Sequence, residues 1–124
     1  MSSTPAMSKR PLILCIDDDD IVLRVRRLLL AGAGYDVLAA SSGEDGLEVF
    51  KQNPVELVIA DHFLRDKVGT EITKEMKALK PQVPILIVSG MAEEACGLEF
   101  ADAFCAKGEP PNVLLDTMAR LLKG

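Results

Sequence analysis

The sequence predicts an α/β fold in which helices cover both faces of a doubly wound, five-stranded parallel sheet. Short apolar runs alternate with segments of helical periodicity along the chain, and the loops between them are short. The composition, 48% hydrophobic and 27% charged, is that of a globular chain with a full core. Because the chain has 124 residues, we expect one domain over residues 11–124, preceded by a disordered lead-in at residues 1–10.

The first half of the chain begins with a strand, a helix and a second strand. The apolar run at residues 12–16 predicts the first strand, and residues 21–31 follow as a helix that ends at Gly32. The expected core face of this helix comprises Ile21, Val22, Val25, Leu28 and Leu29, with Arg24, Arg26 and Arg27 mostly off it. Residues 35–40 predict the second strand.

Capping and proline signals place the remaining helices. Ser41 and Glu44 form a predicted capping box that opens a helix running to about Asn53, with Leu47 and Phe50 inward. The other expected elements are strands at 55–60, 84–88 and 103–106, a helix at 70–80 with Ile72, Met76 and Leu79 inward, a short helix at 92–100, and a last helix at 111–123 with proline in its first turn.

Charge and cysteine content exclude several classes of protein. The net charge of −5 argues against nucleic acid or an anionic membrane as the main partner. No stretch approaches the roughly 20 apolar residues that a membrane helix needs. An odd cysteine count without framework spacing indicates reduced core thiols in a cytosolic protein, at Cys15, Cys96 and Cys105.

Polar side chains directly follow the predicted strands, where sites form in open parallel sheets. Asp17–Asp20 follow the first strand, Asp61 the third, Ser89 the fourth and Lys107 the fifth. Converging carboxylates repel one another, and a hard divalent cation such as Mg²⁺ relieves that repulsion. A lysine ammonium pairs with a carboxylate or a phosphoryl group. This set describes a site that accepts a phosphoryl group onto a carboxylate.

The same residues, in the same order, resemble the receiver domain of bacterial two-component response regulators over about residues 11–123. The matching positions are the Mg²⁺-holding pair Asp17 and Asp18, the phosphoaccepting Asp61, the loop-closing Gly69, the switch hydroxyl Ser89, the switch aromatic Phe104, and the lysine Lys107. The resemblance implies a flavodoxin-like (CheY-like) sheet with strand order 2-1-3-4-5 and five helices, of which the helix at 92–100 is shortened.

The resemblance also implies a mechanism. Asp61 attacks the phosphohistidine of a sensor histidine kinase or a histidine phosphotransfer protein. Mg²⁺ is held by Asp17, Asp18, Asp61 and the backbone carbonyl of Phe63. Ser89 and Lys107 bind the other phosphoryl oxygens, and Phe104 then rotates. A downstream protein reads the change on the face formed by residues 92–100, 103–106 and 111–123.

Such a protein is a phosphoacceptor rather than an enzyme with turnover, although it takes part in its own phosphotransfer and slow autodephosphorylation. We expect it in the cytoplasm, as a monomer or a phosphorylation-dependent dimer. We expect no contact with nucleic acid or membrane. The chain reads as a stand-alone domain that acts by protein contact, and a fragment of a larger regulator or hybrid kinase is the alternative.

Four features depart from the family pattern. Arg65 stands where the family usually has proline, and Gly108 stands where proline often follows the lysine, so we expect a trans bond before it. The stretch between Ser89 and Lys107 is short. Apolar Phe63 and Met91 stand two residues past Asp61 and Ser89, at positions that in the family border the path of the hydrolytic water. They predict a long-lived aspartyl phosphate.

Three residues next to the predicted site, Asp19, Asp20 and His62, are expected to lie outside it. Asp19 and Asp20 are expected to start the following helix and face solvent, in contrast to Asp17 and Asp18. His62 is expected to be a surface loop residue, because no cysteine or second histidine supports a transition-metal site.

Two other functions remain open at this stage. Asp18-Asp-Asp20-Ile-Val22 fits the nucleophile motif of haloacid-dehalogenase-like phosphatases. Those enzymes need a further acidic pair beyond the lysine, and the motif leaves Asp61 without a role. A phosphorylation-independent binding module on the same fold is the other alternative, supported by Arg65, Gly108 and the short 92–100 segment.

Overall fold

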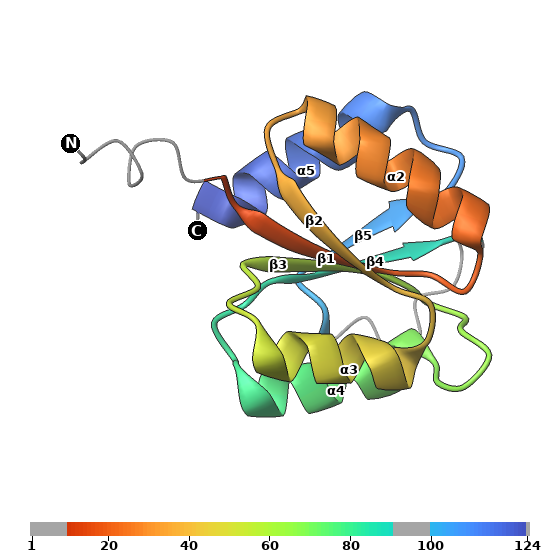
Figure 1. Ribbon diagram of the computed structural model, residues 1–124, viewed down its shortest axis with the longest axis vertical. Helices are drawn as coiled ribbons and strands as arrows, with labels where there is room; N and C mark the ends of the chain where they lie inside the picture. The colour runs from red at the N-terminus through yellow and green to blue at the C-terminus, as the bar shows by residue number, and fades with distance from the viewer. Residues whose placement is uncertain (1–9, 91–99, 124) are drawn as a thin grey trace.

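A computed structural model describes residues 10–90 and 100–123, and Figure 1 shows its arrangement. The elements are β1 (Leu12–Ile16), α2 (Asp20–Gly32), β2 (Asp36–Ala40), α3 (Gly43–Gln52), β3 (Leu57–Asp61), α4 (Gly69–Leu79), β4 (Ile85–Ser89), β5 (Ala103–Ala106) and α5 (Pro111–Lys123). Each begins and ends within two residues of its predicted bounds. The lead-in at residues 1–9 and nearly all of the helix predicted at 92–100 lie outside the described residues.

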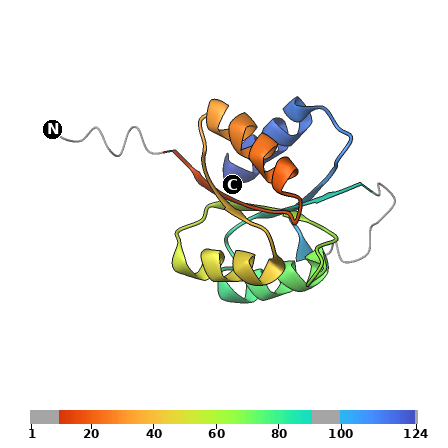
Figure 2. The ribbon, with the colours of Figure 1, turned by 45° about the vertical axis from the view of Figure 1, so that its right-hand side comes forward.

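The five strands form one parallel sheet in the order β2-β1-β3-β4-β5, as predicted. The register places Ile16 of β1 beside Ala60 of β3, and Asp61 beside Val88 of β4. Helices α2 and α5 cover one face of the sheet, and α3 and α4 cover the other (Figures 1 and 2). The carboxyl ends of β1, β3, β4 and β5 therefore meet at one edge.

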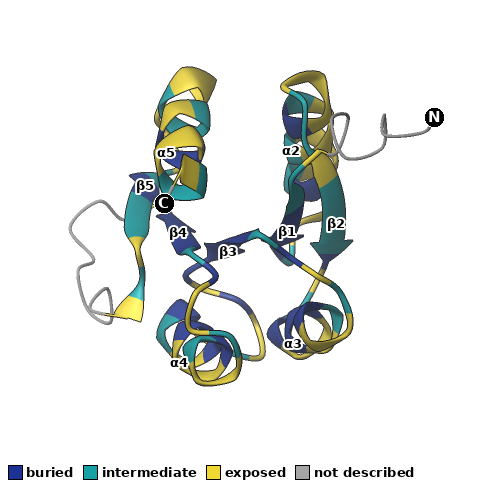
Figure 3. Cartoon of the chain, turned by 90° about the vertical axis from the view of Figure 1, so that its left-hand side faces the viewer, coloured by how far each residue is buried: buried dark blue, intermediate teal, exposed yellow. Residues whose placement is uncertain are grey.

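Alternate residues of each strand enter two separate cores, one on each side of the sheet (Figure 3). Leu14 and Ile16 pack toward α3 and α4, whereas Ile13 and Cys15 pack toward α2 and α5. Burial raises the pKa of the Cys15 thiol to about 12, which keeps it protonated. Cys105 is also a buried free thiol, in agreement with the prediction, and Cys96 lies outside the described residues.

The predicted core face of α2 was wrong for three of its five residues, since only Val22 and Leu29 are partly buried. Ile21, Val25 and Leu28 are 69%, 61% and 70% exposed, and the buried apolar residues are Leu23 and Leu30. Between these two on the helix lies Arg26, whose side chain is only 11% exposed. Leu23, Arg26 and Leu30 are spaced as one helical face, so a charged residue occupies the middle of the buried stripe.

Two smaller expectations also need correction. Ile72 and Met76 of α4 are fully buried as predicted, but Leu79 is 48% exposed because it lies at the last position of the helix. The residue that caps α3 is Ser42 and not Ser41, since the Ser42 hydroxyl accepts the Asp45 N–H at 3.1 Å. In the described part of the chain, none of the helices has the length and apolar character needed to span a bilayer.

The loop after β3 is fastened to the start of α3. The Asp66 carboxylate accepts the backbone N–H groups of Gly43 and Glu44, each at 2.9 Å. These two hydrogen bonds lower the pKa of Asp66, because they stabilise the charged form. The contact supplies orphan donors of the helix with an acceptor and fixes the loop that follows Asp61.

Gly46 allows α3 to approach the end of β1. A Cβ atom at this position would overlap the Cδ1 atom of Ile16 and lie 2.9 Å from its Cγ1 atom. Ile16 is fully buried and directly precedes Asp17. The closeness of helix and strand at this point therefore depends on the missing side chain.

We predict that Gly46→Ala lowers the free energy of unfolding by about 1–3 kcal/mol, because overpacking outweighs the better helix propensity of alanine. Urea denaturation measures the difference. Gly32→Ala is the matched control, since no atom lies within 4 Å of its added Cβ. It should leave stability unchanged or slightly raised. A Gly46→Ala protein as stable as the wild type would contradict the packing argument.

Candidate functional site

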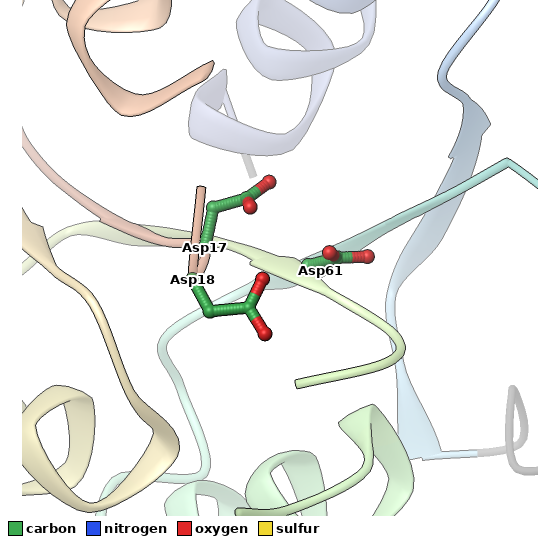
Figure 4. A group of neighbouring side chains, drawn as sticks. All are labelled: Asp17, Asp18 and Asp61. Carbon is green, nitrogen blue, oxygen red and sulfur yellow. The ribbon is translucent and has the colours of Figure 1, made fainter. Parts of the chain in front are cut away.

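Three carboxylates meet at the carboxyl edge of the sheet. Asp17 and Asp18 follow β1, and Asp61 is the last residue of the neighbouring β3 (Figure 4). One oxygen from each lies within 4.8 Å of the others. Asp17 is fully buried, Asp61 is 6% exposed, and Asp18 is partly exposed. The strand order thus brings together acidic groups that are far apart in the sequence.

Lys107 supplies a positive charge from the far side of β4. Its Nζ lies 3.1 Å from Asp61 Oδ2 and 3.6 Å from Asp17 Oδ2. Burial lowers the pKa of Lys107, but the hydrogen bond and charge of Asp61, with the charge of Asp17, outweigh it and raise the pKa above its ordinary value. The backbone N–H of Lys107 donates to the Ser89 carbonyl at 2.8 Å, and this hydrogen bond fixes the start of the loop after β5.

Asp17 is the most constrained of the three acids. Its Oδ1 accepts the Asp19 N–H at 2.9 Å. Its Oδ2 is buried and has no hydrogen-bond partner among the described residues, although Lys107 and Arg26 lie nearby. Burial raises the pKa of Asp17, and the charge of Asp61 adds to this, against the Asp19 hydrogen bond and the two cations.

The run of four aspartates divides into two pairs. Asp19 is the N-cap of α2, and its Oδ1 accepts the N–H groups of Ile21 at 2.9 Å and Val22 at 3.3 Å. Asp20 is the exposed first residue of the helix. The expectation that Asp19 and Asp20 start the helix is confirmed, and only Asp17 and Asp18 join Asp61.

The residues predicted as a switch lie on the two strands beyond β3. Ser89 is the fully buried last residue of β4. Phe104, on edge strand β5, is partly buried and packs against the core under α3 and α4. The Phe63 side chain is 50% exposed, and Met91 lies outside the described residues.

His62 is not the surface residue that we expected, because it is only 7% exposed. Its N–H donates to the Val88 carbonyl at 2.9 Å, and its carbonyl accepts the Gly69 N–H at 2.6 Å. The loop therefore folds back on itself, and a Cβ at Gly69 would lie 2.9 Å from His62 Nδ1. This close approach explains the glycine at position 69.

The structure shows the surroundings of two residues that depart from the family pattern, Arg65 and Gly108. The Arg65 side chain is 88% exposed, and its Nε lies 3.7 Å from Asp18 Oδ2. It therefore brings a solvated positive charge to the outer carboxylate. The described residues contain no cis peptide bond, so the bond before Gly108 is trans as expected.

The donor set fits a hard divalent cation. Its three ligands are carboxylates, and the orphaned Asp17 Oδ2 has an unused lone pair inside the cluster. Oxygen-only ligands suit Mg²⁺, Ca²⁺ or Mn²⁺ rather than soft metals. The Asp61 carboxylate, held by Lys107 on one oxygen, is a candidate nucleophile beside that cluster.

Comparison with known proteins agrees with this geometry. The sequence model of the response regulator receiver domain matches residues 13–117. The transcriptional regulatory protein ZraR of Escherichia coli K12 is 34% identical over 87 residues, which are 70% of this chain and 20% of ZraR. The autoinducer 1 sensor kinase/phosphatase LuxN of Vibrio campbellii is 32% identical over 87 residues, 70% of this chain and 10% of LuxN.

Solved structures give the same result. A CheY-like receiver domain protein from Methanospirillum hungatei JF-1 superposes with a TM-score of 0.86 at 28% identity, covering 93% of this chain and 95% of that one. A response regulator from Chloroflexus aurantiacus gives 0.86 at 30% identity, with coverages of 94% and 100%. The matched region is a fifth or less of the two relatives' own length. Because the family model matches residues 13–117 and the fold is shared, this chain belongs to the response regulator receiver domain family.

Proposed function

We propose that this protein receives a phosphoryl group on Asp61 from a histidine kinase or a histidine phosphotransfer protein and signals its state by protein contact. The observation that carries the proposal is the position of the Asp61 carboxylate. It lies 3.1 Å from Lys107 Nζ and within 4.8 Å of carboxylate oxygens of Asp17 and Asp18. A nucleophile, a cation-binding pair and an ammonium group thus share one edge of the sheet.

The roles within this site follow from the contacts. Lys107 holds Asp61 Oδ2, while Oδ1 receives only a long 3.4 Å contact from the Phe63 N–H. In our proposal an Asp61 oxygen attacks phosphorus, the phosphorus–nitrogen bond of the phosphohistidine breaks, and the imidazole leaves. Lys107 and the Ser89 hydroxyl then bind the transferred oxygens.

The proposed cation is Mg²⁺, held by Asp17, Asp18, Asp61 and the backbone carbonyl of Phe63. When bound, it neutralises charge that develops on the phosphoryl group. The buried Asp17 and the outer Asp18 are not equivalent ligands, because only Asp18 is in contact with solvent and Arg65. The proposal therefore places Asp17 as the fixed ligand and Asp18 as the adjustable one.

A change at Asp61 would reach the surface through β4 and β5. Ser89 and Phe104 lie on these adjacent strands, and Ile87 of β4 pairs with Phe104. Movement of Ser89 toward the phosphoryl group gives Phe104 room to rotate. The output face would comprise β5, α5 and the segment at residues 92–100, of which residues 92–99 lie outside the described part. The downstream protein would bind there.

Asp17→Asn, Asp18→Asn and Asp61→Asn should each reduce phosphorylation by a small-molecule phosphodonor at least about 10-fold, because each removes a ligand or the nucleophile. Intact-mass spectrometry measures the phosphorylated fraction, and titration calorimetry measures Mg²⁺ affinity. Asp20→Asn is the control with the same chemistry on an exposed residue, and it should change neither value. Equal losses at Asp20 would contradict the division of the aspartate run.

The surface of α2 is suited to the phosphodonor protein. Ile21 and Val25 are exposed and line a groove of about 310 Å³ together with Lys107 and Pro110. Exposed apolar side chains beside a reacting site are typical of a docking surface. We therefore place the kinase or phosphotransfer protein on α2 and the loop after β5.

Val25→Glu should slow phosphotransfer from the cognate kinase about 10-fold or more, since it buries a charge in the interface. It should leave phosphorylation by the small-molecule donor unchanged. Leu79→Glu is the matched control, because Leu79 is half-exposed on α4, on the opposite face of the sheet. An equal effect of both variants on kinase transfer rates would exclude docking on α2.

Phe63 and Met91 keep their proposed role in excluding the hydrolytic water. Phe63 lies two residues after Asp61, and half of its surface is exposed to solvent. Phe63→Gln should shorten the half-life of the aspartyl phosphate about 10-fold, because a polar side chain binds water there. The decay of the phosphorylated mass in Mg²⁺ buffer measures it. A wild-type half-life of seconds would refute the proposal.

We propose a phosphoacceptor located in the cytoplasm rather than a phosphatase. Of Asp18 and Asp20, the pair that a haloacid-dehalogenase-like enzyme requires, only Asp18 joins the carboxylate cluster with Asp17 and Asp61. Such an enzyme would turn over a phosphomonoester, whereas a receiver is labelled stoichiometrically. The phosphorylation-independent module is the remaining alternative, and failure of wild-type labelling would favour it.

A further inference from the structure

Arg26 is the one arginine of α2 that points into the protein among the residues described. Its side chain is 11% exposed, whereas Arg24 and Arg27 are exposed. Its Nη1 is buried without a hydrogen-bond partner in the described part of the chain, and it lies 3.9 Å from Asp17 Oδ2. That same Oδ2 is the other buried orphan atom. The two unsatisfied groups therefore face each other.

A buried guanidinium needs a compensating interaction. An unpaired buried charge is costly, and α2 offers apolar residues such as Leu23 and Leu30 on the same face. Arginine at this position takes the place of an apolar side chain that could pack on this buried face. The compensating charge comes from the acidic cluster, with Asp17 as the nearest carboxylate.

The distances leave Asp17 available for a further ligand. Lys107 Nζ at 3.6 Å and Arg26 Nη1 at 3.9 Å both attract Oδ2, yet neither is within hydrogen-bond distance. Oδ1 is already engaged by the Asp19 N–H. The carboxylate is thus held by charge from two directions while one oxygen keeps its capacity to coordinate a cation.

We propose that Arg26 is a built-in counter-cation of the acidic site, which positions Asp17 and lowers the affinity of the site for divalent metal. The inference rests on the Mg²⁺ site of the proposed function. Before a metal binds, Arg26 and Lys107 offset much of the repulsion among the three carboxylates. When a divalent cation binds, the nearby guanidinium repels it, and this repulsion weakens binding.

Arg26 reduces the net negative charge of the carboxylate cluster. Three carboxylates with Lys107 alone would attract Mg²⁺ strongly even before a phosphoryl group arrives. A second fixed cation brings the cluster closer to neutrality. At a given Mg²⁺ concentration, occupancy of the metal site then depends more on the negative charge that the phosphoryl oxygens bring.

The test is a Mg²⁺ titration of the full chain by calorimetry, repeated with Mn²⁺ by electron paramagnetic resonance. Arg26→Met and Arg26→Gln should lower the Mg²⁺ dissociation constant about 10-fold, the size expected for one charge at several ångströms. Arg26→Lys keeps the charge and should stay within about 3-fold of the wild type. The Gln variant serves if the Met variant does not fold, as judged by circular dichroism.

Arg24→Met is the matched control, because it removes the same charge from an exposed position on the same helix. Its dissociation constant should stay within about 2-fold of the wild type, since solvent and salt screen that charge. Equal tightening at positions 24 and 26 would overturn the inference, as would unchanged or weaker binding in both neutral Arg26 variants.

The inference and the proposed function fail differently. If the wild type binds Mg²⁺ and the Arg26 variants do not differ from Arg24→Met, only the role of Arg26 is refuted. If neither the wild type nor any variant binds Mg²⁺ or Mn²⁺, the metal site itself is refuted and the inference falls with it. Binding that is seen only in the neutral Arg26 variants would support the inference.

Discussion

Repulsion among three carboxylates is the constraint on which this site depends. Asp17, Asp18 and Asp61 are brought within 4.8 Å of one another, and Asp17 is fully buried there. Such a cluster costs folding free energy unless positive charge offsets it. Lys107 provides part of that charge through a 3.1 Å contact with Asp61. The repulsion that remains makes cation binding at this site favourable. Cation binding in turn links the folded arrangement of the carboxylates to phosphoryl chemistry.

The surrounding fold serves to hold these groups in place. The parallel order β2-β1-β3-β4-β5 puts the ends of β1 and β3 side by side, and Lys107 reaches across β4 from the end of β5. Close packing at Gly46 fixes the end of β1, and Asp66 fastens the loop after Asp61 to α3. The acidic groups therefore cannot move apart to relieve their repulsion.

The sequence was sufficient for the strands and for the main residues of the site. Continuous apolar runs are typical of strands buried on both faces, and the residue after each run is placed by topology. It was not sufficient for α2, whose spacing of Ile21, Val25 and Leu28 is as helical as that of Leu23, Arg26 and Leu30. Helical periodicity favours the face without a charged residue as the core face. The fold instead buries the face on which Arg26 lies close to Asp17. The burial of His62 and the contacts of Asp66 were missed because both arise from how the loop folds back, which depends on residues distant in sequence.

The central claim is that Asp61 and its neighbours form a working phosphoryl site whose state reaches β5. The most direct measurement is a nuclear magnetic resonance titration of the full chain with Mg²⁺ and beryllofluoride, which stands in for the phosphoryl group on a carboxylate. The account predicts saturable shifts of the Asp61, Ser89 and Phe104 amide signals when beryllofluoride is added to the Mg²⁺-saturated chain, and these shifts vanish in Asp61→Asn. Absence of saturable shifts at these three positions, or the same shifts in Asp61→Asn, would contradict it.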